Sequence, residues 1–218
     1  IFTKNANTWK ERKLSCEDIE PFLLAKKEWG IKTVCSHTAY LLNLASPERN
    51  KFDRSLKALQ EELSRSSKLD ISDVILHPGA HMGSGVDKGL QRIARGINRA
   101  FDRTPDVTCR LLFETTAGQG SNLGHTFEQL AQLVASIEAK EKTGFCFDTC
   151  HVFAACYDLR TEKAYRKTIK AFDKIVGLDR LFVIHLNDAK KGLGSRVDRH
   201  EHIGEGAIGS EAFGFIMN

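Results

Sequence analysis

The sequence contains no apolar run that reaches the roughly 18 residues of a membrane-spanning helix. It also lacks the basic and then apolar opening that marks a signal peptide. These absences exclude a membrane span within the chain. Because the chain begins at Ile1 rather than Met, inside an apolar segment, we expect it to be a fragment of a longer protein.

Cysteine pairs are absent as well. The 218 residues include six cysteines, and none of them forms a CxxC pair. A disulfide framework is not expected in a chain of this size, so we interpret these cysteines as reduced thiols in a cytoplasmic protein. The net charge of +4 permits a polyanionic partner without requiring one.

Short apolar runs, rich in β-branched and aromatic residues, alternate along the chain with segments of helical periodicity. The runs end at His37, His77, Glu114, Asp148 and His185, which lie 40, 37, 34 and 37 residues apart. Such alternation predicts a parallel sheet covered by helices. A steady unit of this length is typical of a (β/α)8 barrel of roughly 300 residues.

We therefore expect residues 1–218 to form a single α/β domain, a (β/α)8 TIM barrel with about six of the eight units present. On this count the first and last strands are missing, and Ile1–Thr3 is the end of a further strand. An open, doubly wound sheet is the alternative, but no GxGxxG follows a first strand. Within the helical segments, Ser15 with Asp18 predicts a capping box, and Ser46 predicts a helix whose first residue is Pro47.

All five run ends carry side chains that ligate metals. In a barrel, the carboxyl ends of the strands surround one rim, where active sites form. A single polar residue often does no more than end its strand, but five such residues in succession favour a metal centre. Imidazole and carboxylate ligands without dedicated cysteines suit Zn²⁺, Mn²⁺ or Fe²⁺. Five ligands exceed one tetrahedral ion, so two or more ions are expected, with Glu114 as a candidate bridge. Paired ions of this kind hydrolyse phosphate esters.

Two further clusters extend this set. The segment "FDTCH" places His151 three residues after Asp148, and "RVDRHEH" places Asp198 and His200 two residues apart. His151, Asp198 and His200 are candidates to hold another ion. A solvated, charged loop is the alternative for the second segment.

Longer motifs then carry a resemblance to a known family. "HPGAH" (77–81), "ETTAGQGSNLG" (114–124), "DTCHVFAACYD" (148–158) and "HLNDAKKGLGSRVDRHEHIGEGAIG" (185–209) resemble the endonuclease IV family of apurinic/apyrimidinic endonucleases. "IFTKN" (1–5) and "SHTAYLLNLASP" (36–47) match as well. The resemblance covers nearly the whole chain in order.

The resemblance implies a zinc-dependent DNA repair hydrolase that cleaves double-stranded DNA 5′ to abasic sites and trims blocked 3′ ends by attack of a metal-bound hydroxide. It also implies a monomer in the cytoplasm, at the nucleoid if the source is a bacterium. About three zinc ions are implied, with manganese possible at some sites. The implied ligand sets, in which Glu114 and Asp148 are also catalytic, are His37, His77 and Glu114; Glu114, Asp148 and His185; and His151, Asp198 and His200.

The same resemblance implies DNA contacts, because family members flip the abasic nucleotide out and insert side chains in its place. The expected contacts are Asn5, Asn7, Tyr40, Leu41 and Arg199. Core packing is the alternative for Tyr40 and Leu41.

The chain departs from the family pattern at three points. Asn7 stands where the family has an arginine, which weakens the expected lesion contact. Cys156 stands where the family has glycine, and a positive φ there would strain it. The glutamate that the last strand brings to the second zinc lies beyond Asn218.

Two other functions stay open at this point. One is a related barrel, similar to xylose isomerase, that isomerises or epimerises sugars with one or two ions. The other is a DNA-binding fragment without catalytic activity, because two strands are missing.

Overall fold

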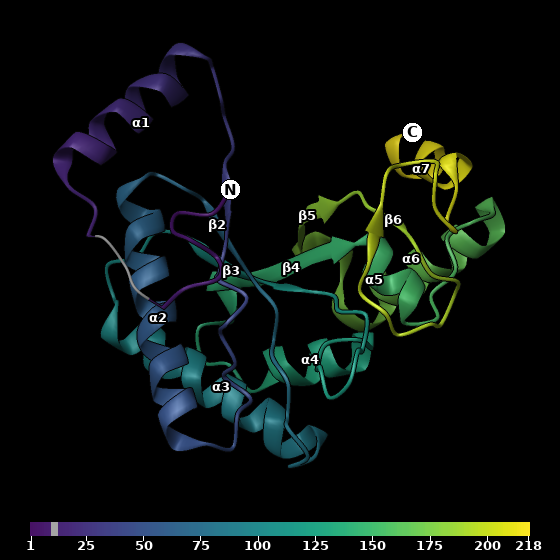
Figure 1. Cartoon of the computed structure of the whole chain (residues 1–218), viewed down its shortest axis with the longest axis horizontal. Coiled ribbons are helices and arrows are strands. Elements are labelled where there is room, and N and C mark those ends of the chain that lie inside the picture. The colour runs from purple at the N-terminus through teal and green to yellow at the C-terminus, as the bar shows by residue number, and fades with distance from the viewer. Residues whose placement is uncertain (10–12) are drawn as a thin grey trace.

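The computed structural model describes residues 1–9 and 13–218, and its centre is a five-stranded parallel sheet (Figure 1). The strands lie side by side in chain order: β1 (Cys35–His37), β2 (Asp73–Leu76), β3 (Arg110–Glu114), β4 (Thr143–Asp148) and β5 (Leu181–His185). This is the order of strands in the wall of a (β/α)8 barrel, so the predicted fold class is confirmed.

Ile1 extends this sheet beyond β1. Its amino group donates to Cys35 O at 2.8 Å, and the His37 N–H donates to Ile1 O at 2.8 Å. Two bonds from one residue to alternate residues of a neighbouring strand are the pattern of parallel pairing. Of the expected strand end Ile1–Thr3, Ile1 thus pairs with β1.

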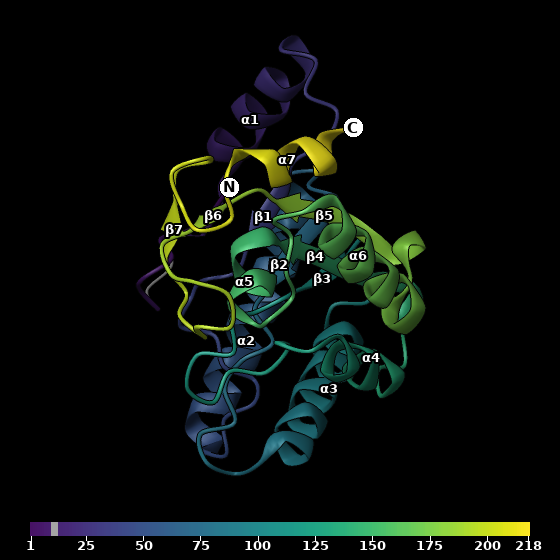
Figure 2. The same cartoon turned by 90° about the vertical axis from the view of Figure 1, so that its right-hand side faces the viewer.

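The helices follow the strands. They are α1 (Cys16–Glu28), α2 (Arg49–Lys68), α3 (Val86–Arg103), α4 (Phe127–Ala135), α5 (Thr149–Ala154), α6 (Glu162–Val176) and α7 (Ser210–Met217). Single-turn 3₁₀ helices, Lys140–Lys142 and Leu178–Arg180, precede β4 and β5. Helices α2, α3, α4 and α6 form a continuous layer along the sheet, whereas α1 stands apart and buries no residue (Figures 1 and 2). In the described part of the chain, no helix is both long and apolar enough to cross a membrane.

The strands bury alternate side chains on opposite faces, as the two-residue period of a strand requires. Leu111 and Phe113 of β3 belong to the large core beneath the helices. Leu112 lies on the other face, in a small cluster with Ile75 and Cys146 that Cys35 and Val183 complete. This second cluster lines the side of the sheet that faces the interior of the barrel.

Helix starts were predicted with mixed success. The Ser15 N–H donates to Asp18 Oδ2 at 2.9 Å, which confirms the capping interaction at α1. The prediction for Pro47 is wrong, because α2 begins at Arg49. Ser46 Oγ accepts the Glu48 N–H at 3.2 Å, so Pro47 lies in a turn before the helix rather than in its first position.

Candidate metal centre

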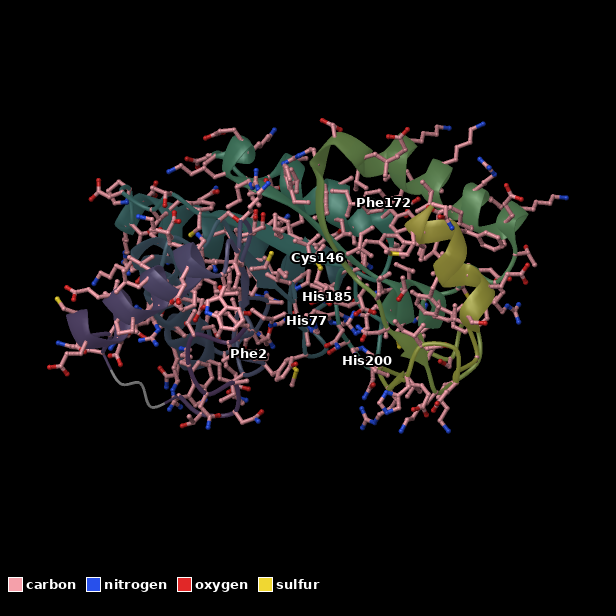
Figure 3. The ribbon with its side chains drawn as sticks, turned by 90° about the horizontal axis from the view of Figure 1, so that it is seen from above. Phe2, His77, Cys146, Phe172, His185 and His200 are labelled. Carbon is pink, nitrogen blue, oxygen red and sulfur yellow. The ribbon has the colours of Figure 1, made fainter. Side chains whose placement is uncertain are left out.

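The five predicted strand-end ligands all project into the interior of the barrel, and the two-residue period explains why. The interior cluster contains Cys35, Ile75, Leu112, Cys146 and Val183. Each candidate ligand follows one of these residues by two positions and therefore lies on the same face. The ligands are His37, His77, Glu114, Asp148 and His185. Figure 3 shows His77 and His185 near Cys146 in the middle of the molecule.

Glu114 lies at the centre of this group and is 2% exposed. Its Oε2 is 2.9 Å from Nε2 of His37 and 2.9 Å from Nε2 of His77, while its Oε1 is 2.8 Å from Nδ1 of His185. Burial favours a higher pKa for the Glu114 carboxyl, but hydrogen bonds with His185, His37 and His77 hold that pKa well below its usual range. An ionised carboxylate therefore faces imidazoles on both of its oxygens, as a bridging ligand does.

Backbone carbonyls orient two of the imidazoles. Nδ1 of His37 lies 2.7 Å from Thr38 O, and Nδ1 of His151 lies 2.8 Å from Thr115 O. Because a carbonyl only accepts, each Nδ1 carries a proton and each Nε2 points into the site. This arrangement is typical of metal-binding histidines, in which the partner of one ring nitrogen fixes the direction of the other.

The second candidate cluster is also assembled. Nε2 of His151 lies 3.2 Å from Oδ1 of Asp198, and Nε2 of His200 lies 3.4 Å from the same oxygen. Burial favours a lower pKa for His151, but Asp148, Asp198 and Glu114 raise it to about 10. The surroundings of His151 therefore favour positive charge, which suits a cation-binding site.

Asp148 connects the two clusters. Its Oδ2 lies 3.8 Å from Nδ1 of His185 and 3.9 Å from Nε2 of His200. The carboxylate is fixed as the N-cap of α5, where Oδ1 accepts the His151 N–H at 2.9 Å, and Oδ2 accepts a hydrogen from Asn187 Nδ2 at 2.6 Å. Sequence reasoning did not identify Asn187, which follows β5 by two residues and orients this carboxylate.

Distances alone group the donor atoms slightly differently from the family-based sets. Within the described residues, donor atoms within 4.8 Å of one another form three groups: His37, His77 and Glu114; Glu114, Cys146 and His185; and Asp148, His151 and His200. The second group holds Cys146 where Asp148 was expected. Burial raises the pKa of the Cys146 thiol, so binding of an ion there would require loss of the thiol proton.

The loop that carries Asp198 and His200 is held by a buried carboxylate. β6 (Asp188–Ala189) pairs antiparallel with β7 (His200–Glu201). Asp188 is 0% exposed. Its oxygens accept the backbone N–H groups of Ala189, Gly204, Gly206, Ile208 and Gly209.

Gly206 is required for this close approach, because a Cβ there would lie 2.4 Å from Asp188 Oδ1. Asp188 therefore fixes the loop that carries Asp198 and His200 without contacting either residue. The sequence alone does not indicate this role.

All the candidate ligands except the fully buried Asp148 line a pocket of about 340 Å³ together with Tyr40 and Arg199. The Tyr40 side chain is 61% exposed, and its ring centroid lies 5.5 Å from that of His37, so the phenol stands at the pocket mouth. Leu41 is 36% exposed. Core packing, the alternative for Tyr40 and Leu41, is therefore excluded.

The loop that contains Asn5 and Asn7 lies beside Tyr40. Both asparagines are exposed, the Asn7 N–H donates to Asn5 Oδ1 at 2.9 Å, and the Tyr40 N–H donates to Ala6 O at 3.2 Å. The predicted DNA contacts Asn5, Asn7 and Tyr40 thus belong to one edge of the pocket. Arg199 is exposed on the opposite loop, beside Asp198.

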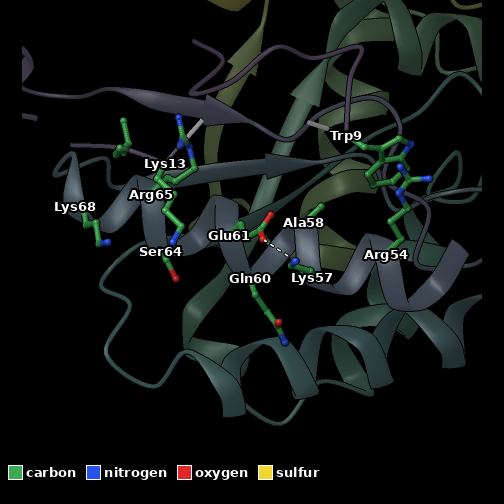
Figure 4. Close-up of a pocket in the computed structure, with 11 residues that line it drawn as sticks. Trp9, Lys13, Arg54, Lys57, Ala58, Gln60, Glu61, Ser64, Arg65 and Lys68 are labelled. Atoms are coloured by element: carbon green, nitrogen blue, oxygen red, sulfur yellow. Dashed lines mark ion pairs between the residues drawn. The ribbon is translucent and has the colours of Figure 1, made fainter. Parts of the chain in front are cut away.

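A larger pocket of about 840 Å³ lies on the outer side of α2 (Figure 4). Its lining includes Trp9, Arg54 and Lys57, and Lys57 pairs with Glu61 at 3.7 Å. Its lining residues include no histidine. The smaller pocket, with its converging imidazoles and carboxylates, is therefore the candidate site despite its size.

The expected strain at Cys156 is present in the backbone. Cys156 has φ +79°, a conformation that glycine adopts without strain and other residues rarely adopt. Its Sγ occupies the space beside Gly194, where an added Cβ would lie 2.4 Å from that sulfur.

Comparison with known proteins agrees with the fold. A family model described as xylose isomerase-like TIM barrel matches residues 2–218. A relative in Geobacter sulfurreducens called "Probable endonuclease 4" is 46% identical over all of this chain and 74% of its own length. The crystal structure of endonuclease IV from Thermus thermophilus superimposes with a TM-score of 0.87 at 33% identity, covering 100% of this chain and 76% of that one.

A D-tagatose 3-epimerase-like protein shares the fold alone, with a TM-score of 0.71 at 19% identity over 88% of this chain and 68% of that one. The fold and the pocket define a TIM barrel with a candidate metal centre at its carboxyl rim. Within that class, the identity of the relatives over the full chain shows that this protein belongs to the endonuclease IV family.

Proposed function

We propose that this protein is a zinc-dependent DNA repair endonuclease that hydrolyses the phosphodiester 5′ to abasic sites and trims blocked 3′ ends. The observation that carries the proposal is the convergence of seven metal-ligating side chains on one pocket, with the buried Asp148 behind it and imidazoles on both oxygens of Glu114. The family of the chain supports the same reaction, because its relatives are named endonuclease 4.

The residues present fit a zinc centre. Histidine nitrogens and carboxylate oxygens are zinc ligands, and manganese is compatible with the same donors. In the proposed arrangement, Glu114 would be shared by a first ion held by two histidines and a second ion held by Asp148 and another histidine. The remaining set would hold a third ion. The full sets are His37, His77 and Glu114; Glu114, Asp148 and His185; and His151, Asp198 and His200.

Zinc ions bound there would lower the pKa of a coordinated water and neutralise charge on the phosphate. The residues of the chain supply position and orientation. The carbonyls of Thr38 and Thr115 direct two imidazoles inward, and Asp148 is held by Asn187. No side chain is required as a nucleophile, so Glu114 and Asp148 act as ligands at the reacting phosphate.

The DNA contacts fit a double-stranded substrate. Tyr40 stands exposed at the pocket mouth and the adjacent Leu41 is exposed as well, so both can replace the missing base in the stack. Arg199 and the two asparagines of the opposite edge are placed to contact the sugar-phosphate backbone. We infer that the protein acts as a monomer in the cytoplasm, on nucleoid DNA.

The test is nicking of a duplex with one abasic site by zinc-loaded protein, with an undamaged duplex as the control. We expect a nick 5′ to the site that leaves a 3′-hydroxyl, and loss of activity after prolonged chelation. His200→Asn should reduce activity at least about a hundredfold, since even the partners of metal ligands contribute 10–100-fold.

His202→Asn is the matched control, because this neighbouring histidine is exposed and lies outside the pocket lining. Metal content separates the alternatives. About three zinc ions per chain support the nuclease, whereas one or two favour a sugar isomerase or epimerase. A zinc-loaded chain that binds the abasic duplex without cutting it would be the non-catalytic fragment, and the endonuclease proposal would be wrong.

A further inference from the structure

A third pocket, of about 350 Å³, lies between the beginning of α2 and one face of α3. Four of its lining residues are arginines: Arg49, Arg92, Arg95 and Arg99. None of them belongs to the candidate metal centre. Helices α2 and α3 pack against each other along this boundary (Figure 1).

The positive charge of this pocket is poorly compensated. Asp53 is the one acidic residue of its lining, and it lies 3.6 Å from Arg49 Nε. Within residues 1–9 and 13–218, no ion pair is formed by Arg92, Arg95 or Arg99. Like charges four residues apart on a helix destabilise it, so Arg95 and Arg99 repel each other unless an anion lies between them.

Two of the guanidinium groups are already fixed in place. Arg92 Nε donates to Ala45 O at 2.8 Å, and the Arg95 guanidinium lies 5.4 Å from the centre of the Phe52 ring. Desolvation and the neighbouring charge of Arg95 lower the pKa of Arg92. The pocket therefore holds preorganised donors whose charges lack a counter-ion, as an anion site requires.

The N-terminus of α2 adds to this positive potential. The helix is 20 residues long and has no acidic residue in its first turn, and its acidic N-cap residue Glu48 pairs with Lys51 at 2.8 Å. Its dipole and its free N–H groups favour an anion near Ser46 and Pro47, which also line the pocket. Planar guanidinium groups beside a helix N-terminus match the oxygens of a phosphate group.

The pocket lies at the same edge of the sheet as the metal centre. The loop from β1 to α2 begins at the ligand His37, exposes Tyr40 at the metal pocket and ends at Ser46. Asn43 ties this loop to the one after β2, because its Oδ1 accepts the Ala80 N–H at 3.0 Å and its Nδ2 donates to Ala80 O at 3.0 Å. The β1–α2 loop therefore connects the metal pocket, which Tyr40 lines, with the arginine pocket, which Ser46 lines.

From these observations we propose that the arginine pocket binds a backbone phosphate of the DNA duplex flanking the lesion. The inference rests on the proposed function, since it places the phosphate on a DNA substrate of the same rim. It extends the DNA-contacting surface from the metal pocket along the β1–α2 loop to α3. A free inorganic phosphate presents the same chemistry, so the experiment separates the two.

The test measures binding of zinc-loaded protein to an undamaged fluorescent duplex, which the proposed activity does not cut, at salt concentrations between about 50 and 200 mM. Arg99→Gln is compared with Arg103→Gln. Both arginines are exposed on α3 one turn apart, and only Arg99 lines the pocket. Each variant removes one charge, so non-specific electrostatics change equally.

We expect Arg99→Gln to weaken duplex binding and to lower by about one the slope of log affinity against log salt concentration, a roughly fourfold smaller loss of affinity across this salt range. Arg103→Gln should match the unchanged protein. Equal salt slopes for the two variants would overturn the proposal. So would loss of inorganic phosphate binding in Arg99→Gln with an unchanged duplex slope, which would assign the pocket to a free anion. Nicking is measured separately, so a failure of the proposed endonuclease activity is distinguishable from either result.

Discussion

Replacement of Asp188 by asparagine tests how the second ligand cluster is held. Oδ2 of Asp188 accepts the N–H groups of Gly204, Gly206 and Gly209, and Oδ1 accepts those of Ala189 and Ile208. Asp188→Asn replaces one oxygen with an NH₂ group, which leaves at least two buried N–H groups facing a donor.

An unsatisfied buried group costs about 1–3 kcal/mol, so the total is about 2–6 kcal/mol. That is a large part of the 5–15 kcal/mol by which a domain is stable.

The loop can avoid this cost by local unfolding, in which it detaches from the rest of the protein. It carries Asp198 and His200, so its release removes two of the three proposed ligands of the third ion. We expect Asp188→Asn to reduce zinc from about three to about two ions per chain, while the ions at Glu114 stay bound. Zinc content after dialysis and the free energy of unfolding of the chelated protein are the two measurements.

Glu205→Gln is the matched control, since Glu205 is an exposed acid of the same loop. It should change neither zinc content nor unfolding by more than about 0.5 kcal/mol. The reasoning is refuted if Asp188→Asn keeps its full zinc content and unfolds within the same margin of the unchanged protein.

Two further substitutions test the stability of the fold and the binding of DNA. Cys156→Gly should raise the free energy of unfolding by about 1 kcal/mol, because glycine adopts the φ of +79° without strain; a chemical denaturation curve with an unchanged or lower midpoint would contradict this. Tyr40→Ala should weaken binding of abasic-site duplex by about 1–3 kcal/mol, the contribution of one stacked base, whereas Tyr40→Phe should retain it. Equal affinities of the alanine and phenylalanine variants would show that the exposed ring does not contact DNA.

The sequence predicts the parts of this site that depend on strand periodicity. Ligands such as Glu114 and His185 end apolar runs, and the fixed two-residue period directs them all to one face. The fold class follows from the same regular spacing. Asp198 and His200 were also found, because the charged loop around them is unusual and the family motif includes it.

Features that depend on contacts between distant segments could not be predicted. Asp188 is separated from the N–H groups it accepts by 16 or more residues, apart from its neighbour Ala189. Arg49 and Arg99 belong to different helices and become neighbours only when α2 packs on α3. The prediction for Pro47 was wrong because the Ser46 hydroxyl accepts the Glu48 N–H and forms a local turn. The helix therefore begins two residues later, at Arg49.

The most direct test of the account is anomalous diffraction at the zinc edge from crystals of metal-loaded protein. The account predicts about three peaks in the pocket around Glu114, one of them bound by His151, Asp198 and His200. A single peak, or peaks that none of these side chains ligates, would contradict the claim that the strand ends and the charged loop form one metal centre.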